Sequence, residues 1–318
     1  GLVGSEMCIR DRFQPVSIFK RRLMFLIEKM EIFPFSTNER HIVNYLLSEK
    51  QSIEGMSTAD IAKATYSSKS ALVRIAKKLD FSGWVDFKKA FLTELYYLDK
   101  LNQSVDANLP FSKQDNLITI ANRIAKLKQE AILDTVSLLD NATLEQAVNL
   151  LEQAKSIHIF AASNNLLNAQ EFQHNMKRIQ KDVHVHQLHG EILFDAYLVP
   201  KESCALVISY SGETLSLQRV MKLLRRHHIP IILLTSLGEN KSTNLTNCIL
   251  RLATREKLYS KIGTFSTDAS ITYLLDLLYS GVFAQNYENR LALRIHASQL
   301  IEFERTSSSK ILNEAEEE

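Results

Sequence analysis

The segment Ile208–Thr214 combines the residue types that bind a phosphate group. It reads Ile-Ser-Tyr-Ser-Gly-Glu-Thr and lies between an apolar run and a stretch with helical periodicity. A helix N-terminus presents unpaired backbone N–H groups and partial positive charge, which attract anions. We expect Ser209, Ser211 and Thr214 to donate hydroxyl hydrogen bonds to the ligand, while Gly212 permits its close approach to the backbone. The alternative is a turn capped by serine and threonine that binds no ligand.

Three other polar residues follow neighbouring apolar runs. Ser163, His189 and Glu256 each come shortly after a segment with the pattern of a buried strand. Ligands of parallel sheets bind at the carboxyl ends of the strands, so we expect Ser163 and His189 to face the same cleft as the phosphate-binding segment. For Glu256 two interpretations stay open. It either orients a ligand hydroxyl or acts as a base, or it is a solvent-facing glutamate between Arg255 and Lys257.

Three closely spaced histidines could be metal ligands: His184, His186 and His189. Alternation along a strand puts only the first two on one face, and no Cys, Asp or Glu completes a ligand spacing. The cysteines are too few and too scattered for a disulfide framework: Cys8, Cys204 and Cys248. We therefore expect no metal and no other cofactor, and the cysteine usage fits a reducing cytoplasm.

A second chemistry is indicated nearer the N-terminus, where a helix with a basic face follows a short turn. Residues 58–79 have the dimensions of a helix-turn-helix, with the turn at residues 65–67. Apolar residues at helical spacing pack inward in the second helix and leave its basic side chains free to reach phosphates and bases. An ordinary solvated basic face is the alternative. The residues expected to contact DNA are Ser68, Lys69, Ser70, Arg74, Lys77 and Lys78.

Helical periodicity and cap residues place this basic face within an all-α region. A polar stretch without periodicity, residues 99–115, is expected to be a linker. The helices before it are expected over residues 18–30, 36–49, 58–64, 69–79 and 84–97.

Beyond the linker, apolar strands alternate with helices. A helix over residues 116–139 comes first, and the alternation that follows predicts an α/β domain. Such a domain has a parallel five-stranded sheet with helices on both faces. The strands are expected over residues 156–161, 183–188, 204–209, 229–235 and 248–252.

The length and charge of the chain suit two such domains. Its 318 residues, 45% of them hydrophobic, provide enough apolar material for two cores of ordinary size. The formal net charge of +2 is nearly balanced, so any DNA contact must come from local clustering of basic residues. No apolar run reaches the roughly 18 residues that span a bilayer, and no signal-peptide pattern is found. We expect neither membrane contact nor secretion.

The first residues are set aside before the domains are assigned. Glu6–Asp11 resembles a translated sequencing-library adapter, so residues 1–12 are taken as an artefact or a disordered segment. The remaining division is a helix-turn-helix DNA-binding domain (13–98), a linker (99–115), the α/β domain (116–290), and a C-terminal helix with an acidic tail (291–318).

Several runs resemble the RpiR family of transcriptional regulators. The Ser163 loop and the 209–214 loop resemble the sugar isomerase (SIS) fold, which forms the second half of these regulators, over about residues 117–287. The resemblance implies that Ser266, at the start of the last helix of the domain, is another serine on the ligand side. In the N-terminal part it extends to about Leu95 and rests on Ser36–Arg40, Met56–Ala62, Ser68–Arg74 and Lys77–Gly83.

Two places depart from the pattern of the family. Asp80 stands where glycine is usual at a helix exit, and aspartate tolerates a left-handed backbone less well, which predicts a rearranged turn. Ala161 and Ala162 stand where glycines are common in the first loop. A degenerate scaffold that senses no ligand therefore stays open as an interpretation.

Together these features predict a regulator whose binding to operator DNA is modulated by a phosphorylated sugar or amino sugar. It is expected to act as a homodimer or homotetramer, because such regulators read paired half-sites, with Ser266–Gln285 supplying part of the interface. We do not expect an enzyme. A sugar-phosphate isomerase is the alternative, because the same scaffold hosts enzymes, but isomerisation needs a placed base and a ring-opening acid.

Overall fold

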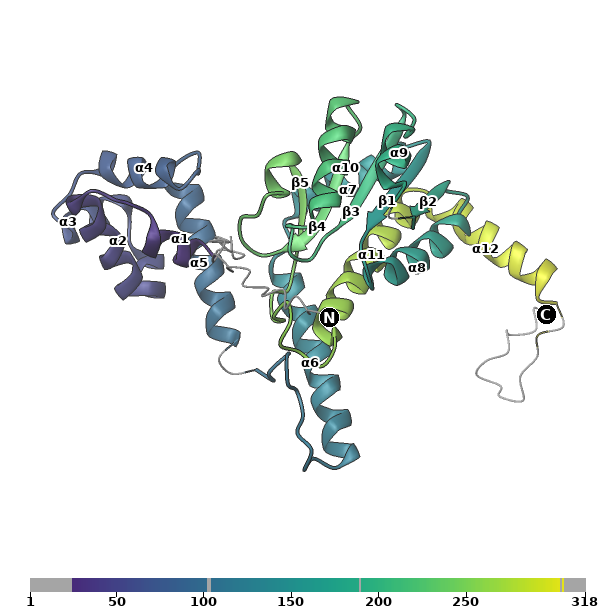
Figure 1. Ribbon diagram of the computed structural model, residues 1–318, viewed down its shortest axis with the longest axis horizontal. Coiled ribbons are helices and arrows are strands. Elements are labelled where there is room, and N and C mark those ends of the chain that lie inside the picture. Colours follow the sequence, from purple (N-terminus) through teal and green to yellow (C-terminus); the bar gives the residue numbers. More distant parts are fainter. Residues whose placement is uncertain (1–24, 102–103, 189, 304, 306–318) are drawn as a thin grey trace, which may run out of the picture.

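The computed structural model describes residues 25–101, 104–188, 190–303 and 305 of the chain. Four expectations concern residues outside these ranges: the segment 1–12, the beginning of the helix expected from Ile18, the candidate ligand residue His189, and the acidic tail. The described residues form a helical N-terminal part and an α/β C-terminal part, as predicted (Figure 1). None of the helices described is long and apolar enough to cross a membrane.

The helical part packs around one apolar core. Leu46, Ile61, Leu72 and Phe87 are completely buried there, and each such side chain stabilises the fold by about 1.5–3 kcal/mol. The last helix runs into the expected linker, which was predicted to begin at residue 99. The elements are α1 (Leu26–Ile32), α2 (Thr37–Glu49), the 3₁₀ helix η1 (Lys50–Gly55), α3 (Thr58–Ala64), α4 (Lys69–Lys78) and α5 (Trp84–Leu101).

Serine caps begin both helices of the helix-turn-helix pair, α3 and α4. Ser57 Oγ accepts a hydrogen bond from Asp60 N at 3.2 Å, and Ser68 Oγ accepts one from Ala71 N at 3.3 Å. Each cap satisfies a backbone donor that the helix leaves unpaired, which contributes about 1 kcal/mol. Ser57 is therefore the cap of α3.

Asp80 ends the exit turn of α4 in the left-handed conformation that glycine usually supplies, with φ at +72°. Its backbone N donates to Lys77 O at 3.1 Å, and Phe81 N donates to Ala76 O at 3.0 Å, which is the Schellman pattern. The expected rearrangement of this turn is wrong. The Asp80 carboxylate also pairs with Lys29 Nζ at 2.7 Å and so ties the turn to α1.

A sheet of five parallel strands forms the centre of the C-terminal part, in the order β2-β1-β3-β4-β5. Two strands match the predicted ranges residue for residue, and the others differ by one or two residues at one or both ends. The strands are β1 (Ser156–Ala161), β2 (Val183–His186), β3 (Ser203–Ile208), β4 (Ile231–Ser236) and β5 (Cys248–Leu252).

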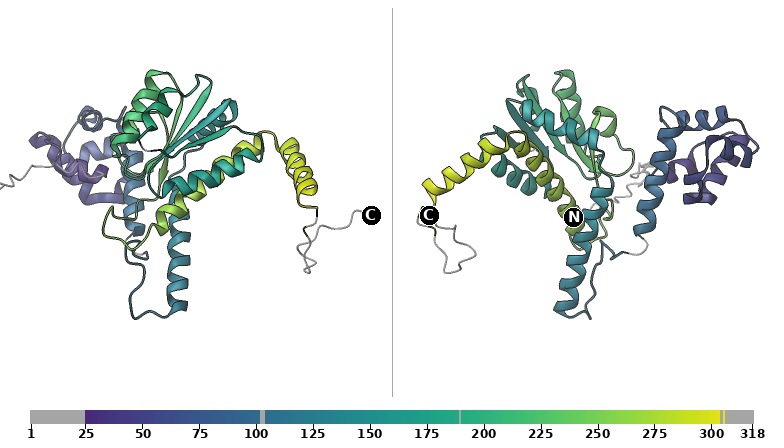
Figure 2. Two further views of the ribbon diagram at one scale, coloured as in Figure 1. Left: turned by 45° about the vertical axis from the view of Figure 1, so that its right-hand side comes forward. Right: turned by 180° about the vertical axis from the view of Figure 1, so that it is seen from behind.

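Helices cover both faces of this sheet (Figure 2). On one face α7 (Asn141–Gln153), α8 (Asn165–Lys177) and α11 (Phe265–Gln285) pack against alternate strand residues such as Ile159. The other face, which includes Phe160, is covered by α9 (Ile192–Tyr197) and α10 (Leu215–Arg226). The remaining elements are α6 (Leu117–Ser137), the 3₁₀ helix η2 (Thr243–Leu245) and α12 (Tyr287–Ile301).

The apolar side of α11 is used inside the protomer. It packs against α6, α7 and α8, and Ile271, Leu274 and Leu278 are buried. Little of this helix is left for the interface between subunits that the sequence suggested. Exposed apolar residues lie instead on α12, which projects from the body (Figure 1), and just beyond its end: Leu291, Ile295, Leu300, Ile301 and Phe303.

Candidate functional site

The strand order places the two predicted ligand loops side by side. The chain turns in opposite directions from β1 and β3, so the crevice at their carboxyl ends is the topological switch point where ligands of such sheets bind. Ser163 follows β1, and the loop Ser209–Thr214 follows β3. Because β1 and β3 are hydrogen-bonded neighbours, both loops border the same crevice.

Gly212 is required by the conformation of the second loop. Its φ is +63°, and a Cβ atom there would lie 2.0 Å from Asn240 Oδ1. The Gly212 carbonyl accepts hydrogen bonds from Gln218 Nε2 at 3.2 Å and from Ser242 Oγ at 2.7 Å. The loop is therefore held in a fixed shape by side chains that lie beneath it.

The hydroxyls of this loop are largely unused by the hydrogen bonds that cap α10. Ser209 is only 2% exposed, and its Oγ has no hydrogen-bond partner among the described residues. Thr214 is the N-cap residue of α10 but makes no side-chain capping hydrogen bond. Ser211 Oγ accepts from Glu213 N at 3.2 Å and keeps its own proton to donate. A simple Ser/Thr-capped turn would have used the Thr214 hydroxyl for the helix.

The Ser163 loop is shaped by a left-handed residue and anchored to α11. Ser163 is exposed with φ at +54°, and the neighbouring Asn164 donates to Asp268 at 3.1 Å. Ala161 faces the core together with Ile159 and is completely buried. Its methyl group therefore does not occupy the crevice, and Ala162 is half-buried against the opposite core.

Glu256 and Ser266 lie together, but the structure closes them to solvent. Glu256 is 6% exposed, so the solvent-facing interpretation is wrong. Its carboxylate accepts hydrogen bonds from the backbone N and hydroxyl of both Ser266 and Thr267, at 2.8–3.0 Å, and pairs with Lys261 at 2.9 Å. Burial by itself would raise the pKa of Glu256, but hydrogen bonds from Lys261, Thr267 and Ser266 outweigh it and hold the pKa below its usual value. In this conformation Glu256 anchors the start of α11, and Ser266 is wholly buried.

The histidines form a cluster that includes one residue the sequence analysis missed. His158 on β1 stacks on both His184 and His186 of β2, and its Nδ1 lies 3.0 Å from His186 Nε2. His186 also contacts Asp195 of α9 at 3.1 Å. Burial lowers the pKa of His158 to about 4. Within the described ranges no group of three or more His, Cys, Asp and Glu side chains could hold a metal ion.

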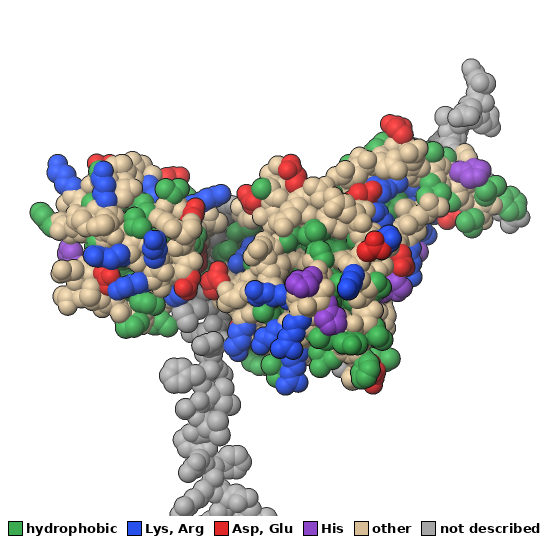
Figure 3. All heavy atoms as spheres, turned by 90° about the horizontal axis from the view of Figure 1, so that it is seen from above, with side chains coloured by type: hydrophobic (Ala, Val, Ile, Leu, Met, Phe, Trp, Pro, Cys, Tyr) green, Lys and Arg blue, Asp and Glu red, His purple; other side chains and the backbone are tan. Residues whose placement is uncertain are grey.

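The predicted DNA-reading residues lie on α4 and at its N-cap, and all six are exposed. Lys69, Arg74 and Lys77 are exposed, and Figure 3 shows Lys and Arg side chains at several places on the helical part, among acidic and hydrophobic ones. Ser68 Oγ caps α4 and lies 2.8 Å from Ser70 Oγ. Lys78 is distinguished from the others by a partner within the protein.

The ammonium group of Lys78 is bound by a carboxylate of its own domain. Lys78 Nζ lies 2.7 Å from Glu39 Oε2, and the hydrogen bond from Lys78 lowers the pKa of Glu39 to about 2. Glu39 is buried at the first turn of α2, where it also accepts from Ser36 N at 3.0 Å. Lys78 therefore joins α2 to α4, and its contact with DNA stays a prediction.

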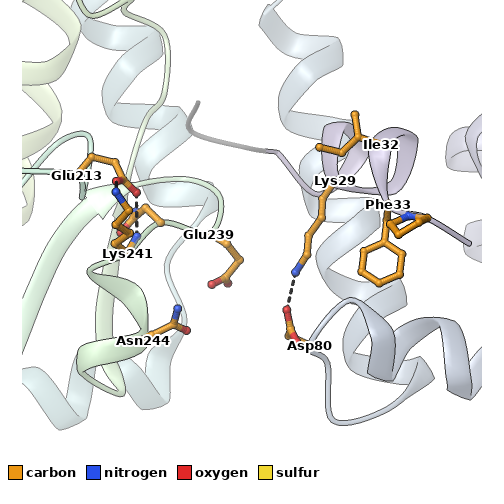
Figure 4. A pocket seen from close by; sticks show the side chains of 10 residues that line it. Lys29, Ile32, Phe33, Asp80, Glu213, Glu239, Lys241 and Asn244 are labelled. Carbon is orange, nitrogen blue, oxygen red and sulfur yellow. Dashed lines mark hydrogen bonds and ion pairs between the residues drawn. The ribbon is translucent and has the colours of Figure 1, made fainter. Parts of the chain in front are cut away.

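A cavity of about 480 Å³ separates the helical part from the loops of the sheet (Figure 4). Lys29 and Asp80 line one side, and Glu213 and Lys241, which pair at 2.8 Å, line the other. Neither Ser163 nor the hydroxyls of the second loop line it, so it is not the predicted ligand crevice. It does bring the residue next to Gly212 opposite the helix-turn-helix part, a neighbourhood that sequence patterns could not show.

Two domain models match the chain. The model described as the helix-turn-helix domain of the rpiR family matches residues 25–96, and the SIS domain model matches residues 150–280. An uncharacterized HTH-type transcriptional regulator of Clostridium perfringens is 24% identical over 281 residues, which cover 87% of this chain and 99% of that protein. The HTH-type transcriptional regulator YbbH of Bacillus subtilis is also 24% identical, over 79% of this chain and 87% of its own length.

Solved structures share the fold. The Vibrio vulnificus NanR protein, solved as a complex with ManNAc-6P, aligns with a TM-score of 0.55 and 19% identity, over 89% of this chain and 100% of that one. The sugar isomerase domain of an RpiR transcription factor from Sphaerobacter thermophilus aligns with a TM-score of 0.50 and 12% identity, over 57% of this chain and 98% of that domain.

Proposed function

The chain is a member of the RpiR family that joins a helix-turn-helix domain to a SIS domain, and we propose that a phosphorylated sugar or amino sugar modulates its binding to operator DNA. A regulator of this kind acts where the chromosome lies, so we also propose a cytoplasmic location. Homodimers or homotetramers suit the reading of paired half-sites.

The observation that carries the ligand proposal is the set of uncommitted hydroxyls at the switch point. The buried Ser209 hydroxyl has no partner among the described residues, which costs free energy that a bound acceptor would recover. The Thr214 hydroxyl is not used by the helix, and the first turn of α10 carries no acidic residue. Phosphate oxygens accept such hydrogen bonds strongly, and the positive end of α10 favours their charge.

The sugar part of the ligand would lie between this loop and Ser163. The exposed Ser163 hydroxyl borders the same crevice, and it can bond a sugar hydroxyl. The NanR structure was solved with an amino-sugar phosphate, which supports this class of ligand for a chain of the same fold.

Coupling to DNA would pass through Glu213. This residue follows Gly212 in the ligand loop, and its carboxylate faces the cavity whose other side carries Lys29 and Asp80 of the helix-turn-helix part (Figure 4). A phosphate held by the hydroxyls of this loop would repel the Glu213 carboxylate and so change the electrostatic field that the helical part faces. Ligand binding thereby changes the relative placement of the DNA-binding domains.

The geometry favours a binding role over catalysis. Glu256 was the candidate base for isomerisation, but its carboxylate is saturated by donors and its pKa is held low. A general base must be able to take a proton from a substrate within hydrogen-bond reach. We therefore propose that the protein senses the sugar phosphate without converting it.

Calorimetric titration of Ser211→Ala tests the proposal. The ligands are ManNAc-6P, glucosamine 6-phosphate and inorganic phosphate, each sugar being paired with its neutral form. Loss of one hydrogen bond to a charged group should weaken the best sugar phosphate by roughly 10- to 100-fold. Ser298→Ala, on the exposed surface of α12, is the matched control and should bind like the wild type. Equal affinity of Ser211→Ala and the wild type would mean that the loop is only a turn.

A further inference from the structure

Tyr66 occupies an unusual position in the turn between α3 and α4. Its side chain is 96% exposed, and its backbone is left-handed with φ at +50°. A bulky residue rarely adopts this conformation, because its Cβ crowds the following carbonyl oxygen. An exposed aromatic ring alone would need no explanation, but an exposed ring kept on a strained backbone does.

The turn is held so firmly that Tyr66 cannot relax the strain. Its backbone N donates to Lys63 O at 3.2 Å, and Ser67 N donates to Ala62 O at 2.8 Å. The hydroxyl of Thr65 donates to Ile61 O and contacts the hydroxyl of Ser67, each at 2.8 Å. The Tyr66 side chain therefore leaves the surface at a fixed point beside the start of α4.

Tyr66 borders a polar groove that opens between the first turn of α2 and the first turn of α4. The groove has a volume of about 590 Å³, and Arg74 of α4 also lines it. The groups on its walls that can still donate to phosphate oxygens include the side chains of Thr37, Asn38 and His41 of α2. The hydroxyls of Ser36 and Thr65 also line it, but they already donate to Glu39 and to Ile61 O. The acidic Glu39 in the same lining is already paired with Lys78.

We infer that this groove seats the sugar-phosphate backbone of one DNA strand, and that the Tyr66 hydroxyl donates a hydrogen bond to one of its phosphates. In helix-turn-helix proteins the first helix crosses the backbone while the second enters the major groove, and Tyr66 lies between the two. Backbone contacts of this kind set the position of the recognition helix on the duplex. The strained tyrosine is kept because it positions Lys69 and Arg74 over the bases.

This inference rests on the proposed binding of operator DNA, and it is tested with the full-length protein. The probes are the tightest duplex that the wild type recovers from a randomised library long enough for two half-sites, and an unrelated duplex of equal length. Binding of Tyr66→Phe and Tyr66→Gly is measured by fluorescence anisotropy at several salt concentrations. Unfolding of the helical domain is followed by the fluorescence of Trp84, the only tryptophan of the chain.

Replacing Tyr66 is expected to weaken DNA binding, and the glycine variant is also expected to raise the stability of the domain. Tyr66→Phe should weaken binding to both duplexes by about 10-fold, because the contact is to a phosphate and carries no sequence information. The salt dependence should stay as in the wild type, since tyrosine displaces no counterion, whereas Arg74→Ala should reduce it. Tyr66→Gly should bind at least as poorly as Tyr66→Phe and yet raise the melting temperature of the domain by about 4 °C, because glycine relieves the strain.

Gln180→Gly is the matched control. Gln180 is an exposed, uncharged residue with φ at +61° in the other domain, so its replacement should stabilise the protein without changing DNA binding. Wild-type affinity of both Tyr66 variants would overturn the inference while leaving the proposed function intact. A wild type that recovers no preferred duplex would instead refute the proposed function. Loss of binding to the selected duplex alone would overturn the phosphate contact in favour of a base contact.

Discussion

Gly212→Ala is expected to disable the ligand loop while leaving DNA binding intact. Alanine at φ +63° costs about 1–2 kcal/mol, because L-residues with a Cβ are disfavoured in the left-handed region. The new Cβ would also lie 2.0 Å from Asn240 Oδ1 and 2.1 Å from its Cγ, far closer than atoms pack. Overpacking of this kind typically costs about 1–3 kcal/mol. The sum is about 2–5 kcal/mol.

Asn240 cannot simply turn away from the added methyl group. Its Oδ1 accepts from Ser242 N at 3.1 Å and from Thr243 N at 3.2 Å, and its Nδ2 donates to Thr235 Oγ1 at 3.1 Å. Moving this buried side chain would break these three bonds. The clash must therefore be relieved by the ligand loop itself, which carries the hydroxyls that we assign to phosphate.

Thermal denaturation and calorimetry measure the two consequences. The melting temperature of the α/β domain should fall by about 5–15 °C, and the stabilisation by a saturating sugar phosphate should be lost. Operator affinity without ligand should match the wild type. Gly190→Ala is the control, because nothing lies within 4 Å of a Cβ at that position.

A melting temperature for Gly212→Ala as high as that of the Gly190→Ala control would refute the reasoning. The packing argument is checked separately by adding Asn240→Ala to Gly212→Ala. If the clash is the cause, the double variant should lose less stability than the sum of the two single losses.

Three further predictions concern DNA binding, pH and assembly. Arg74→Ala and Lys69→Ala should each weaken operator binding by about 1–3 kcal/mol at fixed salt without lowering the melting temperature, and unchanged affinity in both would remove α4 as the reading helix. Burial raises the pKa of Glu94 from 4.5 to about 7, so the folded helical domain holds this proton more tightly than the unfolded chain does. The free energy of unfolding of this domain should therefore be highest below pH 4.5 and should fall by about 3 kcal/mol as the pH rises through 7. Urea denaturation followed by Trp84 fluorescence measures this, and a free energy that does not change with pH would contradict it. Glu94→Gln should remove most of the pH dependence. Sedimentation should show at least a dimer at micromolar concentration, and a monomer alone would exclude the proposed reading of paired half-sites.

Features set by neighbours in the chain could be predicted from the sequence. The limits of β1 and β5 were predicted from short, largely apolar runs, and the Ser68 cap of α4 bonds a backbone group three residues away. The loop that we propose for phosphate could be singled out because its hydroxyls and Gly212 lie within one turn. Its position at the switch point then follows from the order of the strands.

Features that depend on contacts between distant segments could not be predicted from the sequence. Glu94 bonds the backbone N of Leu26 and of Ile27 from 68 and 67 residues away, and no local pattern marks it as a buried carboxylate. Burial raises its pKa because the two N–H groups replace only part of the hydration that it loses. His158 was missed for the same reason, since its partners lie on another strand.

The positive charge of a lysine predicted its role less well than the ion pair that it forms in the fold. Helical spacing puts both Lys77 and Lys78 outside the core, and on that ground both were expected to contact DNA. The fold gives Lys78 a carboxylate from α2, 39 residues earlier in the chain, while Lys77 stays free of any ion pair among the described residues. Lysine side chains are alike in reach and charge, so what separates the two is whether an ion pair would have to break before a phosphate could bind. Lys78 therefore joins α2 to α4, whereas Lys77 has no such ion pair to break, and we expect Lys77 to be the stronger of the two in a phosphate contact.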